Sequence, residues 1–304
     1  MFHSVELLKT LKVLMVNLLY CFFQNVRHLF LKNWYLFIGS YFKVLGVLWL
    51  GFEAYGELQN KDINMSFVCF ILLSIFLGFI YCLFDGYLYT GFFKNKIEIK
   101  SNSFNTSISV KFGDLFSQSG WKAIAVNDFF DGIVDDDLVS IKSLHGIAIS
   151  KFWQNPHDWQ SQIDNSLKRM SFNKEKRAKG NKKRYPIGTT AFAQKDDQKI
   201  LFVALGYTDT NTNLTSATSK SLIQAVRGLL EEARTKCAGE ELFIPLMGSG
   251  LSRVGIKNLI LVYIIWAAIF EETKQSKITE KITIVLPWEQ AKEINLVNFK
   301  KDWN

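Results

Sequence analysis

The chain has 304 residues, enough for about two domains, and a net charge of +8. Its mean hydropathy of +0.08 is unusually high for a basic protein, because apolar residues crowd the N-terminal third and the excess positive charge lies after it. The four cysteines are far apart, with no Cys-x-x-Cys motif and no zinc-type His/Cys spacing. Composition therefore argues against a structural zinc site and against a disulfide framework.

Residues 1–33 are predicted to form an amphipathic helix that lies on the membrane surface. Their unbroken apolar stretches are too short to cross a bilayer comfortably, and no small-residue cleavage site follows them, as a signal peptide requires. The polar residues near one helical face are Glu6, Thr10, Asn17, Gln24 and His28. A third, poor membrane span is the alternative.

Residues 34–92 are predicted to form a two-helix transmembrane hairpin, because Trp34–Phe52 and Met65–Phe84 are each long and apolar enough to span a bilayer. The connecting loop is net acidic, whereas the flanks outside the hairpin carry Arg27, Lys32, Lys94, Lys96 and Lys100. Since positive flanks stay in the cytoplasm, we expect a multi-pass protein of the inner (plasma) membrane with a cytoplasmic C-terminal domain.

Lys43 is the only charge in the first predicted span, and a lysine at mid-membrane costs about 2.5–3.5 kcal/mol. It shares one helical stripe with Gly39 and Gly46, and small residues allow close helix contact. The stripe is either a face for assembly or for lining a pore, or it holds a lysine that snorkels to the interface or meets a backbone carbonyl. Both interpretations stay open at this point.

Residues 93–304 are predicted to be a cytosolic α/β domain of three layers, since strand and helix patterns alternate along them. The expected helices are Ser219–Lys236 and Ile256–Thr273. The expected strands are Ile97–Ile99, Ser107–Phe112, Lys122–Val126, Ile187–Ala193, Lys199–Leu205, Leu242–Leu246 and Lys281–Leu286.

Two loops of this domain carry the candidate chemistry. The basic loop, residues 174–184, has seven Lys or Arg against one Glu; it binds an anionic lipid surface or nucleic acid, or it is simply solvated. Lipid is the better functional guess, because no aromatic platform for nucleic-acid bases accompanies the loop. The glycine loop, residues 245–251, follows a short apolar strand and precedes a helix. There, free N–H groups and a helix N-terminus favour an anion, although an ordinary strand–helix turn has the same pattern.

Three segments in order resemble the macro domain, an ADP-ribose-binding α/β fold with a mixed sheet: Ser109–Phe116, Lys122–Asp128 and Pro245–Gly250. The shared features are a Gly-Asp pair before an apolar residue, an apolar strand that ends in Asn, and a later Pro-x-x-Gly-x-Gly loop. The resemblance implies that the ligand is an ADP-ribose derivative and that the protein needs no cofactor or metal.

The resemblance assigns roles to single residues. Asp114 would accept a hydrogen bond from the adenine amino group, Leu115 would lie against adenine, and Asn127 would lie near the distal ribose. Asp114 as a turn residue and Asn127 as a strand-end cap are the structural alternatives. The pyrophosphate-binding loop would be Gly248, Ser249, Gly250 and Leu251. By strand order alone, Thr208 and Asp209 are expected at the rim of the same crevice.

The chain departs from the macro-domain pattern in the acidic loop, residues 128–137, which replaces a glycine-rich loop. Phe130 stands where ADP-ribosyl hydrolases of this fold have a second Asn, which favours binding over catalysis. The carboxylates, beginning with Asp128, would suit a cationic group on the ligand, or they are solvated. They show no definite metal-binding spacing.

The layout as a whole resembles the membrane-anchored macro-domain effectors of Thoeris anti-phage defence. In that family a TIR-domain partner makes a histidine–ADP-ribose signal, a nucleotide-derived second messenger; its binding leads to oligomerisation and membrane disruption. His145 is expected either to line the pocket or to be a core or capping histidine. The alternatives are a membrane-tethered ADP-ribosyl hydrolase and a reader of ADP-ribosylated proteins.

Overall fold

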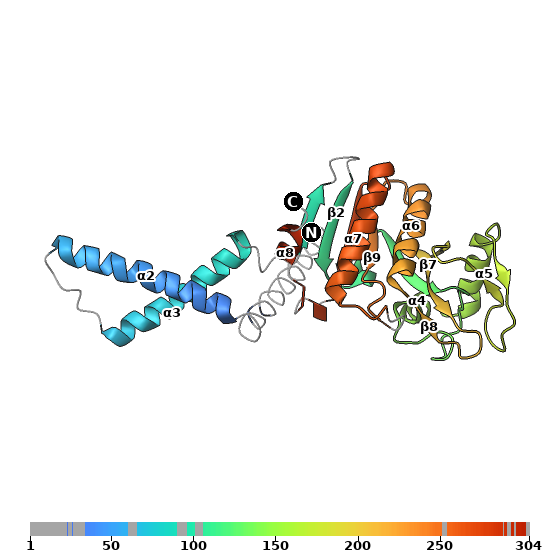
Figure 1. The fold of residues 1–304 in the computed structure, drawn as a ribbon, viewed down its shortest axis with the longest axis horizontal. Coiled ribbons are helices and arrows are strands. Elements are labelled where there is room, and N and C mark those ends of the chain that lie inside the picture. Colours follow the sequence, from blue (N-terminus) through green and yellow to red (C-terminus); the bar gives the residue numbers. More distant parts are fainter. Residues whose placement is uncertain are drawn as a thin grey trace, which may run out of the picture. The chain divides into compact units, whose positions relative to one another are not determined.

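The computed structural model describes residues 23, 26, 34–59, 66–89, 96–100, 106–250, 254–287, 289–290, 293–294 and 296–301 (Figure 1). They fall into two compact units: one holds Met1–Asn95 with Asn295–Asn304, and the other is Lys96–Ile294. Almost all of the predicted amphipathic helix lies outside the described residues. The domain boundary at residue 93 stays a prediction.

The first unit contains two apolar helices, α2 (Trp34–Gln59) and α3 (Phe67–Phe84), and a π-helical turn, Asp85–Tyr89. Phe37–Leu58 and Phe67–Leu88 are each long and apolar enough to cross a membrane, by length and composition alone. The helices pack closely at Gly78, where an added Cβ would lie 3.0 Å from the Tyr41 Cα atom. A small residue at this crossing therefore lets the backbones meet.

The two glycines of the predicted stripe on α2 are not part of this packing. A Cβ atom added at Gly39 or Gly46 would meet no heavy atom within 4 Å. Lys43 is exposed, with its Nζ atom 5.9 Å from the centroid of the Tyr81 ring on α3. The glycine positions of the stripe therefore stay open within this pair of helices.

The second unit is built on an eight-stranded mixed sheet, in the order β1-β2-β10-β9-β3-β7-β6 with β8 beside β7. Strands β2, β10, β9, β3 and β7 run parallel, and β1, β6 and β8 pair antiparallel. The strands are β1 (Lys96–Lys100), β2 (Ser107–Phe112), β3 (Trp121–Asn127), β6 (Thr190–Lys195), β7 (Gln198–Thr208), β8 (Thr215–Ser216), β9 (Leu242–Pro245) and β10 (Lys281–Leu286). The predicted α/β domain with a mixed sheet is confirmed. Because the central strands are parallel, five carboxyl ends meet at one edge of the sheet.

Helices cover both faces of the sheet (Figure 1). Helices α4 (Leu144–Phe152) and α5 (Pro156–Ser166) share a core with alternate strand residues such as Ile124 and Phe202. Successive strand side chains point to opposite faces, so the residues between them face α6 (Ser219–Lys236) and α7 (Asn258–Gln275). This unit also holds the hairpin of β4 (Asn173–Lys174) and β5 (Lys183–Arg184), whereas α8 (Leu296–Lys301) belongs to the first unit.

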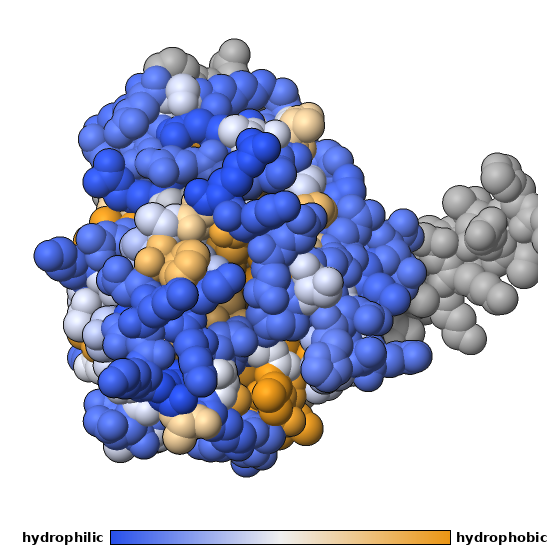
Figure 2. All heavy atoms as spheres, turned by 90° about the vertical axis from the view of Figure 1, so that its right-hand side faces the viewer, coloured by the Kyte–Doolittle hydropathy of each residue, from blue (hydrophilic) through white to orange (hydrophobic). Residues whose placement is uncertain are grey.

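The start of β6 and the presence of several short elements differ from the sequence predictions. Strand β6 begins at Thr190 rather than Ile187, because Gly188 adopts a φ of +93° that belongs to a turn and not to a strand. The short helices α4 and α5 were not predicted, although their N-caps were readable: Ser143 accepts the Gly146 N–H, and Asn155 precedes Pro156. The end of the unit that carries α5 is largely hydrophilic, with separate hydrophobic patches (Figure 2).

Candidate functional site

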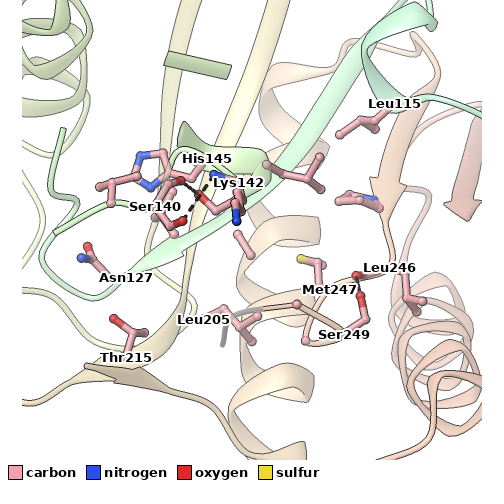
Figure 3. Close-up of a pocket in the computed structure, with 18 of the residues that line it drawn as sticks. Leu115, Asn127, Ser140, Lys142, His145, Leu205, Thr215, Leu246, Met247 and Ser249 are labelled. Atoms are coloured by element: carbon pink, nitrogen blue, oxygen red, sulfur yellow. Dashed lines mark hydrogen bonds between the residues drawn. The ribbon is translucent and has the colours of Figure 1, made fainter. Parts of the chain in front are cut away.

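A pocket of about 880 Å³ lies at the carboxyl ends of the parallel strands (Figure 3). This is the size of a small-molecule site, and in open α/β sheets ligands bind at this edge. Its lining comes from the loops after β2, β9 and β10, the ends of β3 and β7, the acidic loop with the start of α4, and the turn that leads into β8.

The strand order arranges these linings in a row. Asp114 and Leu115 follow β2 at one end, the glycine loop follows β9 in the middle, and Asn127 ends β3 beyond it. Four strand spacings of about 4.8 Å separate β2 from β7, or about 19 Å in all. Figure 3 shows Leu115 on one side of the pocket, Asn127 on the other, and Met247 between them. The pocket is therefore elongated along the sheet edge.

Asp114 both caps a turn and lines the pocket. Its Oδ1 atom accepts the Phe116 N–H at 3.0 Å, which starts the 3₁₀ turn Leu115–Ser117. Its Oδ2 atom has no hydrogen-bond partner among the described residues, so it is free to accept from a ligand. Leu115 is buried at 4% exposure and lies beside it in the lining.

The glycine loop presents backbone to the middle of the pocket. Gly248 has a φ of +84°, and Ser249 Oγ donates to the Leu246 carbonyl at 2.9 Å (Figure 3). Within the described chain, the N–H groups of Gly248, Ser249 and Gly250 donate to no backbone carbonyl. Free N–H groups on a glycine-rich turn form an anion-binding concavity. Leu251, the last predicted member of the loop, lies outside the described residues.

Asn127 lines the pocket, and its side chain is held from behind by Asp131. The Asn127 Nδ2 atom donates to Asp131 Oδ2 at 2.9 Å, and its Oδ1 atom accepts the Asp131 N–H at 3.1 Å. An amide nitrogen carries two hydrogens, so one remains for another acceptor. Asn127 is thus a cap within its own loop as well as a pocket residue.

The structure does not bring Asp128, Thr208 and Asp209 into the pocket lining. Asp128 is 1% exposed, pairs with Arg184 at 2.7 Å and accepts the Thr208 N–H at 3.0 Å. Burial raises the pKa of its carboxyl, and the Arg184 guanidinium only partly offsets this. Asp209 instead accepts backbone N–H groups of the turn that follows β7. Strand order correctly predicted the edge of the sheet at which these residues lie. Their side chains, however, bond to other residues of the domain and do not line the pocket.

The acidic and basic loops are largely paired with each other. Arg177 bonds to Asp131 at 2.8 Å, and Lys179 bridges Asp135 and Asp137 at 2.6 and 2.8 Å. Lys179 lowers the pKa of the Asp137 carboxyl, which lines the pocket. The described part of the chain holds no cluster of three or more His, Cys, Asp or Glu side chains placed to hold a metal ion.

His145 satisfies both expectations made for it, because it lines the pocket and is also a core residue. It is 5% exposed, and its ring lies 5.0 Å from the Trp159 ring and 6.0 Å from the Phe202 ring, centroid to centroid. Burial lowers its pKa to about 3, so the imidazole is neutral at cytosolic pH. Among the residues that the structure describes, its buried Nε2 atom has no hydrogen-bond partner.

Several lining segments were not predicted from the sequence. They are residues 138–140 and 142–144, between the acidic loop and His145, and residues 213–216 before and within β8. Local signals were the N-cap Ser143 and Asn213, which has a left-handed φ of +58° that asparagine tolerates. The other segments reach the pocket through the tertiary fold.

Comparisons with known proteins agree with this architecture. The family described as "Thoeris protein ThsA, Macro domain" matches residues 108–287. The chain is 27% identical over 220 residues to Thoeris protein ThsA of Bacillus amyloliquefaciens (strain Y2), covering 69% of this chain and 71% of that protein.

Solved macrodomains are more distant in sequence. A macrodomain of Oceanobacillus iheyensis with ADP is 14% identical, with a TM-score of 0.48 over 68% of this chain and 96% of that one. A macrodomain of Trypanosoma brucei in complex with ADP-ribose is 11% identical, with a TM-score of 0.42 over 65% and 69% of the two chains. The family match spans more than half of the sequence and the whole pocket-bearing sheet from β2 to β10. The chain therefore belongs to the Thoeris ThsA macro-domain family.

Proposed function

We propose that this protein is a membrane effector of anti-phage defence whose macro domain binds an ADP-ribose derivative in the pocket at the sheet edge. Family membership supports the defence role, and relatives of the same fold have been solved with ADP and with ADP-ribose. By resemblance to Thoeris effectors, the ligand is histidine–ADP-ribose, made by a TIR-domain partner. That partner acts through the signal and need not touch this chain.

The single observation that carries the ligand class is the order of groups along the pocket. At one end lies a carboxylate oxygen with no partner among the described residues, in the middle lie N–H groups of the glycine loop that donate to no backbone carbonyl described there, and beyond them lies an asparagine amide. An adenosine diphosphate with a further sugar presents matching groups in the same order: an amino donor, a dianionic bridge and hydroxyl groups.

Binding without turnover is the favoured activity. Phe130, at the position of a second Asn in hydrolases of this fold, is 0% exposed and packs edge-on against Tyr185 at 5.5 Å. It therefore contributes no polar group to the pocket. A membrane-tethered ADP-ribosyl hydrolase or a reader of ADP-ribosylated proteins is the alternative, which assays for product release and for protein ligands distinguish.

The helices α2 and α3 are proposed to anchor the protein in the inner membrane, with the macro domain in the cytoplasm. Their surfaces are rich in exposed large apolar side chains, such as Phe42, Trp49 and Phe76, and lipid would cover these. Signal binding would then promote homo-oligomerisation through the open stripe at Gly39, Lys43 and Gly46, and the assembled helices would disrupt the membrane. A ligand drives such a change only if it binds the assembled state better.

Calorimetry on the full chain in detergent tests the ligand class. ADP-ribose should bind with one site per chain, and the affinity should fall strongly when Gly250 in the glycine loop is replaced by valine. ADP-ribose and histidine–ADP-ribose should compete for the same site, the latter binding more tightly. If purified wild-type protein binds neither compound, the proposed function is wrong. Release of free ADP-ribose from an ADP-ribosylated protein would establish the hydrolase instead.

A further inference from the structure

Arg177, in the basic loop, is a buried cation. It does not line the pocket itself, but it is hydrogen-bonded to a residue that does. Its side chain is 0% exposed. Its Nε and Nη2 atoms donate to Asn213 Oδ1 at 3.3 and 2.8 Å, and Asn213 lines the pocket. The guanidinium therefore holds the turn between β7 and β8 at one wall of the pocket.

The other branch of the same guanidinium reaches a second pocket residue through one intermediate. Arg177 Nη1 donates to Asp131 Oδ2 at 2.8 Å, and this carboxylate oxygen also accepts from Asn127 Nδ2 at 2.9 Å. Asp131 Oδ1 is held by the Asn181 N–H at 2.7 Å, and the Asp131 N–H fixes Asn127 Oδ1. Asn127 has its carboxamide oriented by Asp131, and Asp131 is held in turn by the basic loop.

A neighbouring arginine has similar surroundings but makes no direct hydrogen bond to a residue that lines the pocket. The guanidinium carbons of Arg177 and Arg184 lie 4.3 and 4.5 Å from the centroid of one ring, that of Phe129. Both residues come from the basic loop, are 7% exposed and form a buried ion pair with an aspartate of the acidic loop. The partners of Arg184 do not line the pocket: they are Asp128, Thr208 and Glu175.

We infer that Arg177 is a positioning residue for the part of the ligand beyond the diphosphate. It ties Asn127 at the end of β3 and Asn213 before β8, which form the wall farthest from Asp114 along the strand order. A planar guanidinium serves two acceptors in a fixed fork, which a single ammonium or an uncharged side chain does not reproduce. The described hydrogen bonds of Arg177 reach neither Asp114 and Leu115, at the adenine end, nor the glycine loop. The inference rests on the proposed function, and it names Arg177 as the residue that sets the selectivity of the pocket for the distal part of the ligand.

The test compares two nucleotides that share adenosine diphosphate and differ only in the distal ribose, namely ADP and ADP-ribose. Their affinities are measured by calorimetry on the full chain in detergent, for wild type, Arg177→Met and Arg184→Met. Wild type should prefer ADP-ribose. Arg177→Met should weaken ADP-ribose binding about tenfold and leave ADP binding nearly unchanged, since the hydrogen bonds at the distal end lose their geometry. Arg184→Met should keep the wild-type preference.

If the substitutions act only through a general loss of stability, the affinities for ADP and for ADP-ribose should fall together, and Arg184→Met should lose as much affinity as Arg177→Met. That outcome overturns the inference. An unchanged preference in Arg177→Met overturns it as well. If either methionine variant is not recovered folded, Arg177→Lys and Arg184→Lys replace the pair, because each keeps the buried charge; the preference should fall only in the former. Wild-type protein that binds neither of these nucleotides nor histidine–ADP-ribose refutes the proposed function itself. Wild type that binds ADP and ADP-ribose equally well refutes only the inference.

Discussion

Substitution at the two glycines of the glycine loop should separate ligand binding from stability. Gly250 is exposed, lacks a positive φ, and an added Cβ would meet no heavy atom within 4 Å. Gly250→Val should therefore change the free energy of unfolding by less than about 0.5 kcal/mol. In the complex, however, the branched side chain occupies the space through which the diphosphate approaches the N–H groups. Each hydrogen bond to a charged group contributes about 1.5–3 kcal/mol, so the affinity should fall about ten- to a hundredfold.

Gly248→Val should behave in the opposite way, because this glycine is part of the fold. Its φ is +84°, and an added Cβ would lie 2.7 Å from the Val254 Cγ2 atom. A non-glycine residue in that conformation costs about 1–3 kcal/mol, and overpacking adds about 1–3 kcal/mol. With a middle value of about 4 kcal/mol, the melting temperature should drop by about 8–16 °C for a domain of this size.

Thermal unfolding and calorimetry with ADP-ribose on the same preparations check both expectations, with Gly250→Ala as a graded control that should lose less affinity than Gly250→Val. Gly250→Val that binds ADP-ribose as wild type does would show that the diphosphate does not lie against the glycine loop. If Gly250→Val melts as early as Gly248→Val, the expected separation of binding from stability is refuted, because the loop would then act through the fold alone.

Three further outcomes are expected. An ADP-ribosylated protein incubated with the full chain should show no release above background, whereas turnover that disappears in Asn127→Ala would establish an enzyme. In cells that produce the signal, Lys43→Leu, or Gly39→Leu combined with Gly46→Leu, should abolish depolarisation read by a membrane-potential dye at matched expression; wild-type depolarisation in both would exclude this stripe as the working face. The His145 pKa is lowered to about 3 in the folded state, so the unfolded chain binds the extra proton and stability falls with pH below the unfolded value of about 6.5. Between pH 7.5 and 5.5 the wild type should lose about 1.4 kcal/mol more free energy of unfolding than His145→Gln in denaturant titrations, and equal losses would contradict the buried, neutral imidazole.

Local sequence patterns were sufficient for most of the α/β fold. Short apolar runs marked the central strands, and an apolar stripe marked α6. Such periodicity indicates which face of a strand or helix is buried, and it does so whichever element covers that face. The ordered motifs around Asp114, Asn127 and Gly248 then indicated the macro-domain family. Each motif can be read from the sequence because a few consecutive residues determine the backbone turn that it forms.

The partners of charged side chains were decided by the tertiary structure. Asp128 and Arg184 are far apart in the sequence, and nothing near either residue indicates that they meet. The same holds for Arg177, whose acceptors Asp131 and Asn213 come from different loops. A buried charge must be paired, but the sequence does not say which loop folds over it. Asp128 was therefore assigned to the ligand, whereas in the structure its carboxylate is buried and pairs with Arg184.

In the glycine loop, too, the sequence predicted one property and the tertiary structure decided another, within three residues. The sequence identified Gly248-Ser249-Gly250 as a turn that can approach an anion, because only the absence of Cβ atoms matters for that prediction. Which glycine is needed for the fold and which for access depends on φ at Gly248 and on the position of Val254 across the loop. Those are properties of the packed domain, set by contacts between residues that the local pattern does not relate.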